Sequence, residues 1–410
     1  MSLLSLSSRL TSLLLLIAVP AFAARPLTLE QSLTLALERS PRLLSAQAEA
    51  AVAQARLTGA SLLVQDNPEL EAAVGPRRRE SGNTVDVSVG VSQRLEIFGQ
   101  RGARRDAAEA TLSASESRLQ AVRVDLAAEV RQAFARSLAA EQELRLAEDG
   151  LTLAARALQA AEQRLQAGDA SRIEVNTARV ELGQASRARV RAVQRRVQAL
   201  GELRLLLGME PGDEVVPEGN LRVEAAPVPA LSVLLEQAAA QRADLKAARA
   251  EVEAAQAEAR LASRDALPRP RLGASYSREE DAHIIQGTLG IDLPLFNRNQ
   301  AARGVSTARA LQAERALAAT ERFVRSEVGL ALERYRTALA AADVYGDDVL
   351  AAVQENLKLV NEAYLAGKVD FLELLVIRRE ALDASRGYIE ALEEFNAAAA
   401  QLKKSVGSIQ

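Results

Sequence analysis

The sequence has no cysteine and no tryptophan, and aromatic residues make up only 3% of its 410 residues. Without cysteine there can be no disulfide, no thiolate metal site, no cysteine nucleophile and no lipid attached through a cysteine. One histidine and two methionines are too few ligands for a transition-metal site, so we expect neither a metal nor another cofactor. The scarcity of bulky side chains also argues against a thick globular core.

Signals of catalysis and of nucleic-acid binding are missing as well. The chain contains no glycine-rich phosphate loop, no nucleophile paired with a base and no pair of carboxylates in a recognisable pocket context. We therefore predict that it is not an enzyme. Charged residues make up 26% of the chain, but the two signs nearly balance at a formal net charge of -3. This balance gives no basic footprint, so no nucleic-acid partner is expected.

Residues 1–23 are predicted to be a cleavable signal peptide. They contain one basic residue, Arg9, then an apolar run from Leu13 to Val19, and they end in the small residues typical of a cleavage site. A retained membrane anchor is the alternative, but the apolar run is too short to span a bilayer. We therefore expect export, cleavage before Ala24 and, because no cysteine follows, no lipid anchor.

The rest of the chain is rich in alanine, glutamate, arginine, glutamine and leucine, the composition of long helices packed through small side chains. Residues 27–64 resemble a pair of helices interrupted at Ser40-Pro41, because proline opens a helix but disfavours helix at the residue before it. Unbroken helical rods with their return helices are predicted over 101–166, 171–207, 299–365 and 370–402.

The chain is a tandem duplication. The turn RLQAGDASRIEV at 164–175 occurs again within AYLAGKVDFLELL at 363–375, with Gly168 and Gly367 separated by 199 positions. At the same separation the match continues through Glu174 with Glu373, Arg179 with Arg378, Ala185-Ser186-Arg187 with Ala384-Ser385-Arg386, and Gly208 with Gly407. We predict a first structural repeat over 24–216, a proline- and glycine-rich linker over 217–230 and a second repeat over 231–410.

Each repeat also contains a predicted β-hairpin, because the hydrophobic period changes to two. The loops are expected at Pro76 to Asn83 and at Ser277 to His283. In the first hairpin Leu70, Ala72 and Val74 precede the loop on the apolar face, and in the second Leu272, Ala274, Tyr276 and Gly287 belong to it. The residues predicted to face lipid are Val85, Val87, Val89, Val91, Ile285, Leu289, Ile291 and Leu293.

Four strands with one polar and one apolar face cannot close a barrel alone, and an open sheet would expose its edges. Several chains could close one barrel together, with lipid outside and water inside. The alternative is that the hairpins cap a soluble coiled coil. That protein would tolerate charges on the apolar faces of Val85 to Val91 and Ile285 to Leu293, but none occurs there.

The order of helix pair, hairpin, long helix, glycine turn and long helix, given twice, resembles the TolC-like outer-membrane efflux family over essentially the whole mature chain. The words QRLEIFGQRGAR (93–104), LPLFNRNQ (293–300) and YLAGKVDFLELL (364–375) are similar to its cation-efflux branch, the CzcC- and CusC-like proteins. The resemblance implies a mainly α protein with membrane β structure. Three chains would form a homotrimer that combines a long α-helical barrel in the periplasm with a 12-stranded outer-membrane β-barrel, four strands from each chain.

The resemblance also implies partners and cargo. The channel would bind a periplasmic adaptor, or membrane fusion protein, and through it an inner-membrane RND pump, and would export heavy-metal cations. Multidrug efflux and type I secretion remain open as other uses of the same duct. A periplasmic adaptor is a further alternative, but it should have one helical hairpin flanked by compact β domains.

Residue roles follow from the same resemblance. Docking of the adaptor is assigned to Ala167, Gly168, Ala366 and Gly367, although each glycine must also end a helix. Glu174 and Glu373, six residues past the glycines, are assigned to the periplasmic gate and pore, where carboxylate rings favour cations. Val369 and Val376 stand where the family has an arginine and a second carboxylate, so the usual latch is incomplete. Surface glutamates on a coiled coil are the alternative.

Overall fold

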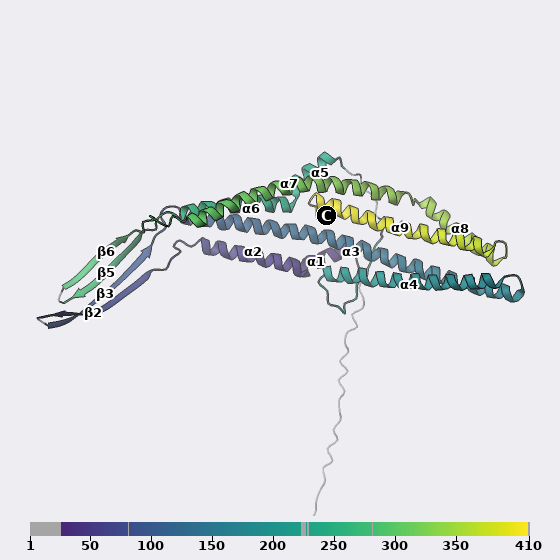
Figure 1. The fold of residues 1–410 in the computed structure, drawn as a ribbon, viewed down its shortest axis with the longest axis horizontal. Helices are drawn as coiled ribbons and strands as arrows, with labels where there is room; N and C mark the ends of the chain where they lie inside the picture. Colours follow the sequence, from purple (N-terminus) through teal and green to yellow (C-terminus); the bar gives the residue numbers. More distant parts are fainter. Residues whose placement is uncertain (1–25, 81, 223–226, 228, 281, 409–410) are drawn as a thin grey trace, which may run out of the picture.

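The computed structural model describes residues 26–80, 82–222, 227, 229–280 and 282–408. The predicted signal peptide, 1–23, lies outside the described residues, as do parts of the predicted linker, 223–226 and 228. The molecule is a long rod, with the β-strands at one end and two helical turns at the other (Figure 1). The short helices of each repeat lie near its middle. The predicted β-hairpins and the predicted glycine turns therefore lie at opposite ends of the molecule (Figure 1).

The first repeat contains seven of the described elements. They are β1 (Pro26–Leu27), α1 (Leu29–Arg39), α2 (Pro41–Ala60), β2 (Glu69–Arg79), β3 (Gly82–Arg94), α3 (Gln100–Ala167) and α4 (Arg172–Leu206). After β4 (Val216–Pro217), the second repeat follows as α5 (Leu231–Gln241), α6 (Ala243–Arg264), β5 (Arg271–Glu279), β6 (Ala282–Gly290), α7 (Gln300–Asp343), α8 (Asp347–Leu365) and α9 (Phe371–Ser405). The predicted order of elements is therefore confirmed.

The interruption of the N-terminal helix pair is confirmed and recurs in the second repeat. Ser40 ends α1 in an extended conformation before Pro41, and Arg242 adopts the same φ of -60° and ψ of 123° between α5 and α6. A glycine with positive φ packs against each interruption. A Cβ at Gly208 would lie 2.6 Å from the carbonyl oxygen of Arg39, and one at Gly407 would lie 2.9 Å from the Arg242 backbone. Glycine is needed at both positions for space and for conformation.

The two long rods differ, and one prediction is wrong here. In the first repeat α3 continues for 68 residues, about 100 Å, without a break. In the second repeat the predicted rod 299–365 is divided into α7 and α8 by Val344, Tyr345 and Gly346. The Tyr345 ring lies against Gly387 of α9, where a Cβ would overlap its hydroxyl group. The tyrosine that leaves the rod is therefore accommodated by the absence of a side chain on the neighbouring helix.

The four long strands form one antiparallel sheet in the order β2-β3-β5-β6. Paired residues lie on the same face of a sheet, and the register aligns Val74 with Val87, Val89 with Tyr276 and Tyr276 with Ile285. The predicted apolar side chains of both hairpins therefore share one continuous face. Val85, Val87, Val89, Val91, Ile285 and Leu289 on this face are all exposed within the single chain.

The strands are longer at the hairpin tips than predicted, and one of them, β6, is shorter at the helix end. Most of the predicted loops Pro76 to Asn83 and Ser277 to His283 belong to strands, because β2 reaches Arg79 and β5 reaches Glu279. Arg77 pairs on the polar face with Asp86 at 2.7 Å and with Glu279 at 2.6 Å. Conversely, β6 ends at Gly290, so Ile291 and Leu293 follow the strand instead of belonging to it.

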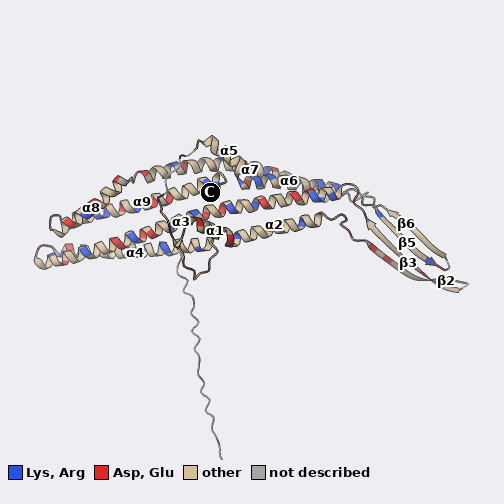
Figure 2. Ribbon diagram, turned by 180° about the vertical axis from the view of Figure 1, so that it is seen from behind, with Lys and Arg blue, Asp and Glu red and all other residues tan. Residues whose placement is uncertain are grey.

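Three apolar clusters hold the helices together. One joins α1, α2, α3, α4 and α9 near the middle of the rod, the second joins α5, α6, α7 and α9, and the third joins both helical turns at one end. Charges of both signs are interspersed along the helices (Figure 2). Among the helices of the described residues, none combines the length and the apolar character needed to cross a membrane.

Candidate functional site at the helical turns

The two turns at the end of the rod are built alike. Gly168, with φ of 87°, and Gly367, with φ of 68°, follow the last helical turns of α3 and α8 in the left-handed region. The amide of Asp169 donates to the Arg164 carbonyl at 2.8 Å, and that of Lys368 donates to the Ala363 carbonyl at 2.9 Å. These bonds satisfy carbonyls that a helix end leaves unpaired. Both glycines therefore end helices, as the sequence requires.

The return helices begin with matching caps. The Ser171 hydroxyl accepts from the Glu174 amide at 3.2 Å, and the Asp370 carboxylate accepts from the Glu373 amide at 2.8 Å. Both glutamates therefore occupy the third helical position, where a negative charge interacts favourably with the helix dipole. The backbone places Glu174 and Glu373 equivalently, and only their neighbours differ.

Glu174 lies between the two helical hairpins. The Tyr364 hydroxyl, on α8 of the second repeat, donates to Glu174 Oε1 at 2.9 Å. The Arg164 guanidinium, on α3, lies 3.6 Å from the same oxygen and 5.2 Å from the centroid of the Tyr364 ring. The Glu174 side chain is 15% exposed. It is therefore the acceptor of a small cross-repeat cluster and not a free surface glutamate.

The cluster changes the acidity of Tyr364, which is almost fully buried in the single chain. Burial, reinforced by the hydrogen bond to Glu174, raises the pKa of Tyr364 to about 12. Both effects disfavour a phenolate, because it would be poorly solvated and would lie beside a carboxylate. The tyrosine is therefore a donor to Glu174 at any physiological pH.

Glu373 has a different environment. Its side chain is exposed, and within the described chain its carboxylate has no hydrogen-bond or ion-pair partner. Leu165 stands where an equivalent of Tyr364 would be, 199 positions earlier, and leucine cannot donate a hydrogen bond. Glu373 therefore keeps its charge available to solvent, whereas Glu174 is engaged between hairpins.

The surface around the turns is open and partly apolar. A Cβ at Gly168 or at Gly367 would meet nothing within 4 Å. Three large apolar side chains near the turns are strongly exposed, namely Ile173 at 78%, Leu365 at 69% and Leu372 at 69%. Exposed apolar side chains clustered at one end are typical of an interaction surface.

Sequence reasoning missed the partners of Glu174. Neither Tyr364 nor Arg164 was assigned a role from the sequence. The contact could not be predicted from residue spacing, because Tyr364 and Glu174 are 190 residues apart in the chain. Among the described residues no group of three or more histidine, aspartate or glutamate side chains could hold a metal ion.

Comparisons with known proteins agree with this architecture. The sequence profile described as outer membrane efflux protein matches residues 33–209 and again 234–408, once in each repeat. The chain is 27% identical, over 396 residues, to the cobalt-zinc-cadmium resistance protein CzcC of Cupriavidus metallidurans, covering 95% of this chain and 93% of that protein.

Solved structures share the fold. A membrane protein from Pseudomonas aeruginosa superimposes with a TM-score of 0.76 at 23% identity, covering 93% of this chain and 90% of that one. The transmembrane channel CusC superimposes with a TM-score of 0.75 at 21% identity, covering 93% of this chain and 92% of that one. The fold is therefore that of the TolC-like channels.

Proposed function

Because the chain belongs to the outer membrane efflux protein family, we propose that it is the outer-membrane channel of a tripartite, RND-type efflux system that exports heavy-metal cations. We infer the cargo from the similarity to CzcC over 95% of the chain, since that relative is a cobalt, zinc and cadmium resistance protein. The family is one of ducts and not of enzymes. The channel would take its cargo from an inner-membrane pump through a periplasmic adaptor.

The geometry of the sheet supports an assembly of several copies, and the likeness to the TolC-like channels favours a homotrimer. The four strands leave β2 and β6 as edges and expose one continuous apolar face, both of which are unfavourable in water. Three copies would pair these edges into twelve strands and turn the apolar face to outer-membrane lipid. Val85, Val87, Val89, Val91, Ile285 and Leu289 supply the lipid-facing strand positions, and Ile291 and Leu293 continue the apolar surface after β6.

The helical turns supply the gate. Glu174, held by Tyr364 and Arg164, joins the two hairpins of one subunit at the inner mouth. Breaking this bond would let α8 move away from α4 and widen the mouth. The free carboxylate of Glu373, repeated three times around an axis, would favour cations, as charged rings in pores do.

The adaptor would dock at Ala167, Gly168, Ala366 and Gly367. The open space around both glycines and the exposed Ile173 and Leu372 beside them support this role. Gly367→Trp should block transport while leaving the trimer intact. Gly367→Ala is the matched control, because it places the same strain on a positive φ without the bulk. Full transport by the tryptophan variant would remove the docking assignment.

The whole proposal is tested by growth of a strain that lacks the protein, with and without plasmid rescue. The cultures would contain graded zinc, cobalt, cadmium and copper, and a parallel series would contain a drug panel. We expect sensitivity to metals that the plasmid reverses. Rescued sensitivity to drugs alone would keep the channel but replace its cargo, and rescue by a variant that does not reach the outer membrane would overturn the duct.

A further inference from the structure

A basic groove runs between the two repeats, away from the turns. Two adjoining cavities, of about 370 and 610 Å³, lie between α3 and α4 on one side and α9 on the other. Carboxylates on their walls are fewer than guanidinium groups. The arginines that line the groove are Arg187, Arg191, Arg195, Arg378, Arg379 and Arg386, and the acidic residues are Glu143, Glu181 and Asp383.

The three acidic residues are already engaged. Glu143 pairs with Arg195 at 2.6 Å, Glu181 with Arg379 at 3.2 Å, and Asp383 with Arg386 at 3.3 Å. Within the described chain, Arg187, Arg191 and Arg378 have no carboxylate within ion-pair distance. The groove therefore contains an excess of positive charge that its own side chains do not neutralise.

Among these arginines, Arg378 gives the strongest indication of a missing anion. It is only 7% exposed, and its Nη2 atom has no hydrogen-bond partner. Burial lowers its pKa to about 10, against opposing effects of Glu181 and Tyr364. A buried cation without a partner is costly, so such a group normally faces an anion. The other strongly buried arginine, Arg242, obeys this rule, because it pairs with both Asp244 and Glu327 at 2.5 Å.

The duplication supplies an internal reference. Arg179, which matches Arg378 in the first repeat, has a 64% exposed side chain and pairs with Glu162 at 3.3 Å. An arginine at this helix position therefore does not have to be buried or unpaired. Of the two copies, only Arg378, which faces the groove, has no carboxylate of the described chain within ion-pair distance.

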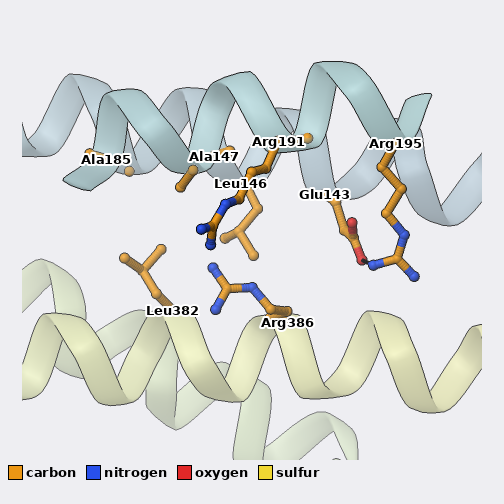
Figure 3. Close-up of a pocket in the computed structure, with 11 residues that line it drawn as sticks. Glu143, Leu146, Ala147, Ala185, Arg191, Arg195, Leu382 and Arg386 are labelled. Atoms are coloured by element: carbon orange, nitrogen blue, oxygen red, sulfur yellow. Dashed lines mark hydrogen bonds and ion pairs between the residues drawn. The ribbon is translucent and has the colours of Figure 1, made fainter. Parts of the chain in front are cut away.

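The guanidinium groups converge across the groove. Arg191 on α4 and Arg386 on α9 extend toward each other in the space between the helices, beside Leu382 (Figure 3). Two cations that face each other repel unless an anion lies between them. Guanidinium groups bind planar and tetrahedral oxyanions through paired N–H donors, so their forked geometry suits such a ligand.

We propose that this groove is a binding site for a small oxyanion of the phosphate or sulfate class, held by Arg378 on its floor and by Arg191, Arg187 and Arg386 on its walls. The ligand bridges α4 of the first repeat and α9 of the second. It therefore ties the two helical hairpins together at a second point, distinct from the Tyr364 and Glu174 bond. This site does not depend on the proposed cargo or partners.

The test uses the full-length protein purified in detergent at pH 7. Thermal unfolding is followed by circular dichroism while sodium phosphate is titrated against sodium chloride of equal ionic strength, and binding is measured by calorimetry. We expect a saturable rise in Tm with phosphate. Arg378→Gln should weaken phosphate binding about tenfold or more, since it removes a charge-assisted hydrogen bond. Arg179→Gln, the matched control, should leave it unchanged.

Two results would overturn the site. One is a phosphate effect no larger than that of sodium chloride, which would mean that the groove binds no free oxyanion. The other is an equal phosphate effect in wild type and Arg378→Gln. Should Arg378→Gln fail to assemble, Arg191→Gln replaces it, because Arg191 is exposed and its loss leaves the helix packing intact.

Discussion

The two repeats share the backbone features of the turns, the interruptions and the junctions of strand and helix, but they differ at the break between α7 and α8 and in the side chains that meet the other repeat. The N-terminal caps of α4 and α9, the interruptions at Ser40 and Arg242 and the glycines at 208 and 407 occur twice with similar geometry. At the junction of strand and helix, Gln100 accepts from the Phe98 amide at 2.9 Å, and Gln300 accepts from the Arg298 amide at 2.7 Å. These backbone features are therefore common to both copies of the duplication.

The contacts between repeats follow no such symmetry. Tyr364 reaches from the second repeat to Glu174 of the first, but Leu165 cannot return the bond to Glu373. Arg179 is paired on the surface, whereas Arg378 is buried in the groove. Because both repeats belong to one chain, a hydrogen bond between them can be made in one direction only. The second copy of each position is then free to differ, as Glu373 and Arg378 do.

The largest effect is expected in the β-hairpins, where equivalent substitutions in the two repeats should have the same consequence. Val87→Asp and Ile285→Asp each place a carboxylate on the same apolar face and repeat it in every subunit, which is unfavourable against lipid. We expect either change to abolish trimer in the outer membrane, measured by fractionation and native electrophoresis. Ser88→Asp, on the polar face, is the control. Normal trimer in either apolar-face variant would defeat the lipid-facing assignment.

The next effect compares glycines that share a conformation but not a neighbour. Gly208→Ala and Gly407→Ala should each destabilise the fold by about 2–4 kcal/mol, because positive φ strain adds to a clash with backbone. Gly168→Ala and Gly367→Ala should cost about 1–2 kcal/mol, since only the strain applies. Chemical denaturation of the purified variants measures the differences. Equal costs at all four positions would contradict the packing described at the interruptions.

A smaller effect concerns the bond that only one repeat makes. Tyr364→Phe should destabilise the hairpin end by about 1–2 kcal/mol and raise single-channel conductance, because it frees Glu174. The folded-state pKa of Tyr364, about 12, lies above the ordinary value of 10. The folded state therefore holds this proton more tightly, and the stabilisation present below pH 10 is lost as the pH rises toward 12.

The pH dependence separates this bond from general alkaline unfolding. Wild type should lose stability between pH 10 and 12 more steeply than Tyr364→Phe, when Tm is measured across that range. Tyr388→Phe, which leaves the Glu174 bond untouched, serves as the reference. Parallel curves for wild type and Tyr364→Phe would show that the bond does not contribute.

The smallest effect tests the break that divides α7 from α8. Alanine normally stabilises a helix relative to glycine by about 1 kcal/mol. Gly387→Ala should instead destabilise the protein by about 1 kcal/mol, because its Cβ overlaps Tyr345. In a Tyr345→Leu background the same change should become stabilising, a sign reversal that a double-mutant cycle detects. Without that reversal, Tyr345 would not be the reason for glycine at 387.

Much of this architecture could be predicted because its signals are local. The period of two in Val85 to Val91, the proline at 41 and the glycines at the turns each specify conformation through neighbours in sequence. The loop at Pro76 to Asn83 was wrong because Arg77 is stabilised by Asp86 and by Glu279, which lies 202 residues away. Polar composition alone could not distinguish a loop from a paired strand.

The break at Tyr345 and the cluster at Glu174 were not predicted from the sequence, because both depend on contacts between residues that are distant in the chain. A single glycine such as Gly346 is tolerated inside helices, and its meaning here depends on Gly387 in another helix. The acidic pair Asp347-Asp348 after Gly346 is a helix-start signal that could have located the break. No comparable signal connects Tyr364 to Glu174, so only the fold brings them together.

The short parallel pair of β1 and β4 bears on the order in which the chain folds. It joins Pro26 to Val216, and the Glu218 amide donates to the Leu27 carbonyl at 2.9 Å beside it. The N-terminus of the first repeat is thereby joined to the segment that directly follows this repeat, whereas β3 must wait for β5 of the second repeat. A chain that emerges from its N-terminal end can complete the helices of one half early. Its sheet, which needs long-range pairing, is the slow and aggregation-exposed step.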